Sequence, residues 1–322
     1  MTCPLVSIII VSWNTKKYLR DCIISIENQT YTNFEIILVD NASSDGSIEF
    51  VKENFSKVHV IKNDDNLGFA EGNNIGIKNS KGSIIALFNP DAVADKNWLS
   101  NLISILSSSD TIAAASGKMY YLGDQFGKDK IFCTWPKIDP ITAMPFNYNN
   151  NEPISKVDYL SGAAMVVKKS IIDKIGLLDS DYFLYFEETD WCARMIRAGY
   201  DLIYTPNAIV WHAVSATISE SDKKIYYMER SRIRFALKNF DRFYLLIFSL
   251  YFFMESFFVF TRDIKKKNFS RSRIRFRTIL WNLCNMWSTI SKRKKEMSIL
   301  RRNGRIKSYN KSLPLRELKI NT

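Results

Sequence analysis

Short apolar runs alternate with amphipathic stretches through the first hundred residues of this 322-residue chain. The apolar runs are four to seven residues long and cover Val6–Ser12, Phe34–Asp40, Val58–Ile61 and Ser83–Phe88. Segments with helical spacing of apolar residues follow them at Lys17–Asn28, Ser47–Asn54, Gly68–Asn79 and Trp98–Leu106. Strands joined through helices pair in parallel, because a parallel pair needs a long crossover connection. The pattern predicts an α/β fold with an open, mostly parallel sheet flanked by helices.

Charge is distributed unevenly along the chain. Residues 1–222 contain 19 Lys and Arg against 27 Asp and Glu, a formal net charge of −8. Residues 223–322 contain 26 basic against 6 acidic residues, a net charge of +20. A domain that binds nucleic acid should carry its basic surface on the folded body rather than at one end. We therefore expect an acidic body with a basic tail, and no nucleic-acid partner.

The cysteines and the start of the chain point to a reducing compartment. The five cysteines are scattered, odd in number and without CxxC spacing, which predicts neither a disulfide framework nor a zinc site. The segment Met1–Ser12 lacks a basic region before its apolar run. It is typical of a first strand and not of a signal peptide.

Polar residues stand at the carboxyl end of each predicted strand. They are Asn14, Asp40, Asp64–Asn66 and Asn89–Asp91. In open α/β sheets ligands bind beyond the carboxyl ends of the strands, so these residues are candidates for a single site. For the segment VDNASSDGS, which begins at Val39, an ordinary strand-to-helix turn capped by Ser44 or Asp45 explains the residues equally well.

Three glycines recur at every fourth residue in the segment NLGFAEGNNIG. Gly68, Gly72 and Gly76 would lie on one face of a helix, which favours close packing of that helix on the sheet. The same arrangement places a helix N-terminus where it can face a nucleotide phosphate. The spacing is not GxGxxG, so it does not indicate a dinucleotide-binding fold.

A later acidic group and one histidine complete the candidate residues. The segment YFLYFEETDWCAR places Glu187, Glu188 and Asp190 at a helix start, where acids complement the helix dipole. Carboxylates crowded beside a cleft can also raise one pKa and produce a general base. His212 follows the apolar segment AIVW and is one of two histidines. A lone histidine is more often structural, but at a strand end it is a candidate metal ligand.

Taken in order, the segments VSIIIVSWN, VDNASSDGS, NLGFAEGNN, FNPDA and FEETDWCAR resemble the motifs of family 2 inverting glycosyltransferases, which have the GT-A fold. The resemblance covers about residues 5–235. It is strongest for the bacterial rhamnosyltransferase-like branch. It implies a metal-dependent hexosyltransferase that uses a nucleotide-sugar donor.

The resemblance also assigns roles to residues. Asp40 corresponds to the acid that contacts the nucleobase, and Asp91 to the last acid of the Asp-x-Asp metal motif. Asn89 replaces the first acid of that motif here. His212 corresponds to a second metal ligand. Glu188 corresponds to the catalytic base, with Asp190 as the alternative. The implied nucleotide-sugar contacts are Ser12, Asn14, Asp40, Asn66, Gly68, Asn73, Asn89 and Asp91, beside a Mg²⁺ or Mn²⁺ ion held by Asp91 and His212.

The implied reaction is a single in-line displacement with inversion, in which Glu188 takes the proton of the acceptor hydroxyl. We expect dTDP-rhamnose as the donor, or else a UDP-sugar. The expected acceptor is a glycan or lipid-linked glycan in O-antigen, capsule or wall polysaccharide synthesis. Two other readings stay open. The first is a sugar nucleotidyltransferase, which usually has a Gly-rich basic loop after its first strand, where this chain has SWNTKKYL. The second is a non-catalytic membrane-associated scaffold, which would not need Asp91, Glu188 and His212.

The basic tail contains two apolar aromatic segments. Phe243–Phe260 is 18 residues long with one charge, and Thr278–Ile290 is 13 residues long, so both are short of the ~20 residues of a spanning helix. A single crossing from a cytoplasmic catalytic domain would export 19 basic residues against the positive-inside rule. Aromatic helices flanked by Lys and Arg are typical of helices that lie in an anionic membrane surface. Packing on the catalytic domain or on a second copy of the chain is the alternative.

These observations predict the domain organisation. We expect a GT-A catalytic domain over residues 1–218, with a nucleotide-sugar half at about 1–117 and an acceptor half at about 118–218. Residues 118–155 are expected to form long surface loops around the site. Residues 219–322 are expected to form a helical, basic, membrane-associating tail. The expected location is the cytoplasmic face of the cell membrane, with a peripheral or monotopic attachment.

Overall fold

A computed structural model describes residues 3–123, 130–148, 153–213 and 222–302 of the chain. The first elements in order are β1 (Val6–Ser12), α1 (Lys16–Glu27), β2 (Phe34–Asn41), α2 (Ser47–Asn54), β3 (Val58–Asn63), α3 (Gly68–Lys78), β4 (Ile84–Phe88), β5 (Ala92–Ala94) and α4 (Trp98–Ser107). The middle of the chain forms β6 (Ile112–Tyr121), β7 (Ile131–Cys133), β8 (Trp135–Ile138), β9 (Pro145–Tyr148), β10 (Ser155–Lys156) and β11 (Ala164–Lys168). Then follow α5 (Lys169–Ile175), a 3₁₀ turn (Ser180–Tyr182), α6 (Glu187–Arg197), β12 (Asp201–His212), α7 (Asp222–Asn239), α8 (Arg242–Lys266), α9 (Ser270–Cys284) and α10 (Met286–Arg302).

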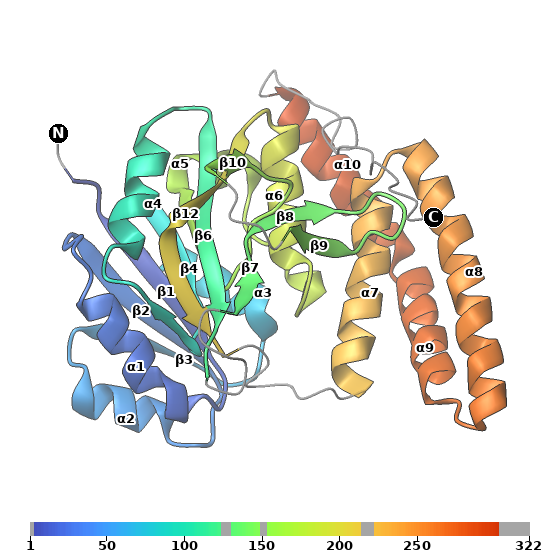
Figure 1. Cartoon of the computed structure of the whole chain (residues 1–322), viewed down its shortest axis with the longest axis horizontal. Coiled ribbons are helices and arrows are strands. Elements are labelled where there is room, and N and C mark those ends of the chain that lie inside the picture. Colours follow the sequence, from blue (N-terminus) through green and yellow to red (C-terminus); the bar gives the residue numbers. More distant parts are fainter. Residues whose placement is uncertain (1–2, 124–129, 149–152, 214–221, 303–322) are drawn as a thin grey trace.

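The main sheet has the strand order β10-β12-β6-β11-β4-β1-β2-β3, with β5 paired to β12 and β7 to β6. The strands β4, β1, β2 and β3 are all parallel, as the alternation of strands and helices predicted. On the other side β11 runs antiparallel to both β4 and β6, so the complete sheet is mixed. Two short strands, β8 and β9, form a separate antiparallel pair. The predicted α/β fold, with a mostly parallel sheet flanked by helices and a helical C-terminal extension, is confirmed (Figure 1).

Alternate residues of the central strand belong to two different cores, because successive side chains of a strand point to opposite faces. Ile8 and Ile10 of β1 pack in the core that contains Leu19 of α1 and Trp98 of α4. Ile9 packs on the opposite face, in the core that includes side chains from α3 and α6. The sheet is therefore covered on both faces, which explains why its strands are continuous apolar runs.

The structure differs from the sequence-based expectation in two places. Part of residues 118–155, expected as surface loops, forms the end of β6 and the short strands β7, β8 and β9. Residues 124–129 and 149–152 of this stretch, including Asn149–Asn151 of the asparagine run, lie outside the described residues. The runs 201–204 and 208–212 are each typical of a strand in the sequence, which predicts two strands, but they form one strand, β12, whose register against β6 shifts between Thr205 and Ile209.

The C-terminal helices pack beside the sheet domain and extend from it as a layer (Figure 1). Phe235 and Phe240 from α7 and its end, Phe248 of α8 and Leu300 of α10 are all buried in one core of the domain. The helix α8 is long and apolar enough to cross a membrane, and only 6% of its most apolar window is buried. The ends of the expected tail, residues 219–221 and 303–322, lie outside the described residues.

Candidate functional site

A cavity of about 880 Å³ lies beyond the carboxyl ends of β1, β2 and β4. Its volume lies in the usual range for sites that bind small molecules and cofactors. Of the residues expected at the site, Asn66, Gly68, Asn89, Asp91, Glu188 and His212 all line it. The cavity therefore brings together side chains from four widely separated parts of the chain.

Asp91 and His212 are in contact although 121 residues separate them. The antiparallel pairing of β5 with β12 places His212 opposite Ala92, directly after Asp91. As a result His212 Nε2 lies 3.0 Å from Asp91 Oδ1 and 3.2 Å from Asn89 Nδ2. A backbone hydrogen bond also joins the two segments at this corner of the cavity: the N–H of Ala213 donates to the carbonyl of Asp91.

This corner of the cavity fits a divalent cation. Asp91 and His212 are buried, and the buried His212 Nδ1 and Asn89 Oδ1 have no hydrogen-bond partner in the described structure. A carboxylate oxygen, an imidazole nitrogen and an amide oxygen are ligands that Mg²⁺ or Mn²⁺ accepts, with phosphate and water completing the shell. Unpaired buried polar atoms are costly and point to a missing partner. Asp91 and His212, with Asn89 beside them, are the described side chains that would hold the ion.

The loop that leads into α6 approaches the cavity in a strained conformation. Phe183, Tyr185 and Phe186 have φ values of 62°, 66° and 70°, which non-glycine residues rarely adopt. Strain of this kind costs about 1–3 kcal/mol per residue and concentrates at functional sites. The backbone of Gly68 lies directly against the loop, so a Cβ there would stand 2.4 Å from the Phe183 carbonyl oxygen. The absent side chain of Gly68 thus lets the loop deliver Glu187 and Glu188 to the cavity wall.

Glu187 is buried and Glu188 is half-buried at the first turn of α6, and both line the cavity. Each has one oxygen, Oε2, without a hydrogen-bond partner. Burial raises the pKa of Glu188, and the backbone N–H groups of Thr189 and Gly162 offset part of this effect. Burial and the neighbouring Glu188 charge raise the pKa of Glu187 well above its ordinary value. A buried pair of like charges holds one proton more readily than an isolated carboxyl does, and Glu188 is the better base of the two.

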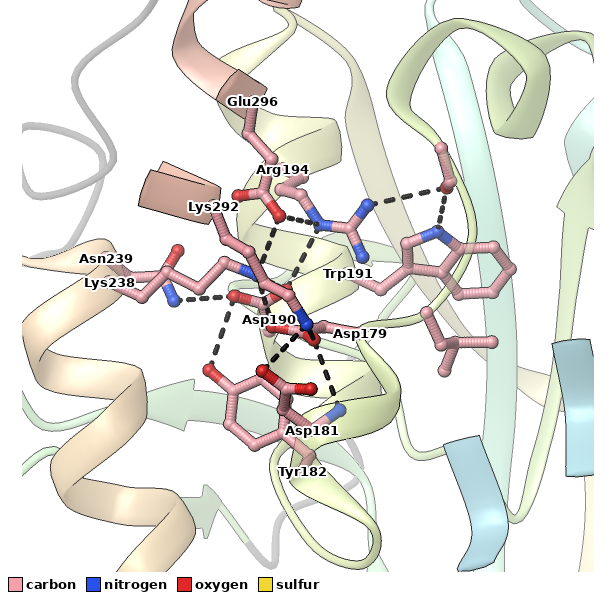
Figure 2. A network of polar contacts seen from close by, with 12 residues as sticks. Asp179, Asp181, Tyr182, Asp190, Trp191, Arg194, Lys238, Asn239, Lys292 and Glu296 are labelled. Atoms are coloured by element: carbon pink, nitrogen blue, oxygen red, sulfur yellow. Dashed lines mark hydrogen bonds and ion pairs between the residues drawn. The ribbon is translucent and has the colours of Figure 1, made fainter. Parts of the chain in front are cut away.

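Asp190 lies in a different environment, away from the cavity lining. Its Oδ2 atom is 2.9 Å from Lys238 Nζ and 3.1 Å from Arg194 Nε, and its Oδ1 accepts from Asn239 (Figure 2). Although burial opposes the charged form, the cations Lys238 and Arg194 lower the pKa of Asp190. A carboxylate held by two cations is a weak base, so Asp190 suits a structural role better than proton transfer.

Asp190 also belongs to an acidic triad with Asp179 and Glu296, whose carboxylate oxygens lie within 4.8 Å of one another. Lys238 Nζ stands among them, at 2.9 Å from Asp179, 2.9 Å from Asp190 and 2.7 Å from Glu296 (Figure 2). The ammonium group therefore holds the position that a metal ion would take. We define the buried ion network as Asp179, Asp181, Asp190, Arg194, Arg234, Lys238, Lys292 and Glu296.

The remaining expected nucleotide contacts lie next to the cavity rather than in its lining. Asn14 accepts from the Ser44 N–H, and Ser12 bonds to Thr15, so both shape the turn after β1. Asp40 is fully buried, with one oxygen accepting from the Ser43 N–H and the other without a partner. Asn73 donates to the Phe69 carbonyl within α3.

Several cavity residues were not expected from the sequence. The aromatic rings of Trp13, Tyr159 and Tyr185 line it, as do Lys223 and Lys224 in the first turn of α7. The Phe183 ring stacks on Tyr227 of α7, with centroids 5.0 Å apart. The lysines had no sequence signal, because nothing in the linear order shows that α7 returns to the site. The aromatic residues were identifiable only as neighbours of the motifs.

Sequence similarity relates the chain to known proteins. The model of the family described as glycosyl transferase family 2 matches residues 7–176. The protein y4gI of Sinorhizobium fredii is 27% identical over 70% of this chain, although the match spans only 27% of y4gI. The low-salt glycan biosynthesis hexosyltransferase Agl10 of Haloferax volcanii is 25% identical over 70% of this chain and 73% of its own length.

A solved structure supports the fold independently. The crystal structure of GalNAc-T7 with UDP, GalNAc and Mn²⁺ superposes with a TM-score of 0.61, covering 88% of this chain and 57% of that chain at 16% identity. At that identity the likeness shows the fold, while the match to the family model extends over more than half of the sequence. The chain belongs to glycosyl transferase family 2.

Proposed function

We propose that the protein is an inverting, metal-dependent hexosyltransferase. It would transfer a sugar from a nucleoside-diphosphate donor to a hydroxyl of a glycan or lipid-linked glycan in cell-surface polysaccharide synthesis, such as O-antigen. The observation that carries the proposal is a single cavity that joins the Asp91–His212 pair to the Glu188 carboxyl, whose Oε2 has no hydrogen-bond partner in the described structure. Our first choice of donor is dTDP-rhamnose and our second is a UDP-sugar.

Glu188 would remove the proton from the attacking acceptor hydroxyl. Its Oε2 has no partner in the described structure, and its raised pKa makes the carboxylate a stronger base than a solvated glutamate. Glu187 beside it has an even more strongly shifted pKa and would stay protonated, which avoids two adjacent buried charges. Because Glu188 acts by proton transfer and not as a nucleophile, the displacement is expected to be single and to invert the anomeric configuration.

Asp91 and His212 would hold a divalent cation at the opposite part of the same cavity. When bound, such an ion neutralises the negative charge that develops on the leaving diphosphate. Lys223 and Lys224 of α7 also line the cavity and add positive charge there. Two similar proteins support a metal-dependent sugar transfer. GalNAc-T7, which shares the fold, was crystallised with UDP, GalNAc and Mn²⁺, and Agl10 is described as a hexosyltransferase.

A donor screen tests the proposal. The purified full-length protein, with Mg²⁺ or Mn²⁺, is mixed with dTDP-rhamnose, UDP-sugars and GDP-mannose, and thermal shift and release of nucleoside diphosphate are measured. We expect one donor class to raise the unfolding midpoint and to be hydrolysed slowly with release of nucleoside diphosphate. Release of pyrophosphate from a nucleoside triphosphate and a sugar phosphate would instead indicate a nucleotidyltransferase. Absence of any effect by every nucleotide sugar would contradict the proposal.

The metal assignment predicts a second result. Asp91→Ala removes the carboxylate of the proposed cation site, so nucleoside diphosphate should lose its dependence on Mn²⁺ for binding. We expect at least ~10-fold weaker binding in the presence of Mn²⁺, since loss of even supporting residues at metal sites costs ~10–100-fold. Calorimetric titration with and without Mn²⁺ measures the effect. Asp173→Ala, an exposed acid of α5 outside the cavity lining, is the control, and an unchanged metal dependence in Asp91→Ala would refute the assignment.

A further inference from the structure

Helix α8 exposes an apolar stripe along its entire length. The stripe recurs every three or four residues and comprises Phe243, Leu246, Leu250, Phe253, Phe257, Phe260 and Ile264, which are 49–74% exposed. At ~1.5 Å per residue the helix is about 37 Å long, so the stripe runs along the molecule rather than forming a point contact. Single exposed apolar residues are ordinary, but a continuous patch of this kind marks an interaction surface.

The stripe continues onto the neighbouring helices. Phe276, Leu280 and Leu283 of α9 are 49–66% exposed, and Trp287 at the start of α10 is 82% exposed. The helices α8 and α9 lie side by side in the outer layer, with α8 outermost (Figure 1). We name the exposed apolar side chains of α8, α9 and Trp287 the apolar face. Tryptophan and phenylalanine are the residues that anchor helices at a membrane interface.

The opposite side of α8 is fixed to the body of the protein. Glu255, at the middle of the helix, pairs with Arg232 of α7 at 2.6 Å and with Arg275 of α9 at 3.1 Å. Phe248, seven residues and so about two turns earlier on the same side, is buried in the core. Because Arg232 and Arg275 are buried, removal of the half-buried Glu255 would leave their charges without this partner, which opposes departure of α8 from the body to cross a bilayer alone. This attachment holds α8 along the outside of the protein, so α8 could meet a membrane only by lying along the membrane surface.

The charges around the apolar face select its partner. In the described stretch 242–284 the exposed charged residues are all basic, namely Arg242, Arg262, Lys265, Lys266, Lys267, Arg271, Arg273 and Arg277. The two acids of this stretch are engaged, Glu255 as above and Asp263 with Ser272. A second copy of the chain would bring like charges together, which disfavours a homodimer through this face. An anionic lipid surface meets both the apolar and the basic requirements.

We propose that the apolar face is a docking surface for an anionic bilayer, into which α8 and α9 insert in the plane of the membrane. The expected leaflet is the cytoplasmic one, which is anionic and where nucleotide sugars are made. The first turn of α7 lies at the basic end of this layer, since Asp222 accepts a hydrogen bond from Ser270 of α9. Lys223 and Lys224, which line the cavity, therefore stand next to the proposed membrane surface. A lipid-linked acceptor would reach the cavity from this side.

The test uses the full-length protein, because α10 supplies Lys292 and Glu296 to the buried ion network and truncation would break it. Flotation with vesicles of phosphatidylcholine alone and with added phosphatidylglycerol measures partitioning. The double variant Leu250→Glu/Phe253→Glu places two charges on the apolar face. The control is Lys52→Gln/Lys57→Gln, in α2 and in the turn that follows it, which changes the net charge by the same amount; α2 lies far from α8 (Figure 1).

We expect binding to vesicles that contain phosphatidylglycerol, unchanged in the α2 control. The double variant on α8 should lower the partition coefficient at least ~100-fold, since each withdrawn apolar side chain is worth roughly tenfold. Equal partitioning of the two double variants would overturn the proposal. A dimer in the absence of vesicles that the α8 variant converts to a monomer, without vesicle binding by the parent protein, would show that a second copy covers the face.

Discussion

Replacement of Glu188 by glutamine is expected to lower kcat by about 10²–10⁴-fold, the range for loss of a general base. Glutamine keeps the size of the side chain but cannot accept the acceptor's proton. Because the proposed metal and nucleotide contacts lie at Asp91, His212 and Asn66, the affinity for the donor should change little. Initial rates with a saturating acceptor, together with a calorimetric donor Kd, separate the two quantities.

Glu187→Gln is the matched control for this experiment. Glu187 is the adjacent carboxyl in the same turn, and burial together with the Glu188 charge raises its pKa well above the ordinary value, which favours its neutral form. Glutamine therefore imitates its resting state, and we expect a modest change in kcat. If Glu187→Gln abolished turnover while Glu188→Gln retained it, the two roles would have to be exchanged. Turnover lost instead with Asp190→Asn in a stably folded variant would assign the base to Asp190.

The pH dependence gives a second measurement of the same group. The base must be deprotonated to act, so kcat/KM should fall as the pH drops through the pKa of Glu188. Burial raises that pKa, which moves the acid limb of the profile above the ~4.3 of an ordinary glutamate. The residual activity of Glu188→Gln should lack this limb. A parent profile that stays flat down to the ordinary glutamate pKa would contradict the assignment.

The part of the fold from β1 to β4 could be predicted from sequence because its signals are local. Each strand from β1 to β4 is an apolar run ended by polar residues, and each boundary agrees with the structure within two residues. Sheet topology then follows from the need for long parallel crossovers. The carboxyl-end rule placed Asn66, Asn89 and Asp91 at one edge of the sheet, where the cavity lies.

The rest depends on pairings that the linear sequence does not contain. The contact between Asp91 and His212 requires β5 to pair with β12, across more than a hundred residues. The sequence places three acids at the start of α6, and the resemblance favours Glu188 as the base but leaves Asp190 as the alternative. In the structure Glu188 lines the cavity, whereas Asp190 forms an ion pair with Lys238 of α7, which lies 48 residues later in the chain. Long-range ion pairs, not residue type, distinguish the two carboxyls.

Loss of the Asp190 carboxylate is expected to destabilise the fold by about 3–5 kcal/mol, the cost of removing one partner from a buried ion pair. Asp190 and Lys238 are both fully buried, and Arg194 shares the same carboxylate oxygen. The buried ion network contains four cations and four anions, so Asp190→Ala leaves one positive charge uncompensated. Such a loss is a large fraction of the 5–15 kcal/mol by which domains are stable. Urea unfolding of the full-length protein measures it.

A second substitution shows whether charge balance is the cause. Lys238→Met alone leaves the network with one excess negative charge, whereas Asp190→Ala/Lys238→Met restores equal numbers of cations and anions. We expect the double variant to be more stable than the sum of the single changes predicts, with a coupling of about 0.5–3 kcal/mol. Asp173→Ala, which breaks the exposed pair with Lys169, should cost no more than ~1 kcal/mol. Strict additivity of the two buried substitutions would mean that lost packing, and not an unpaired charge, determines the effect. In that case the network would fill space between α6, α7 and α10 without holding them together electrostatically.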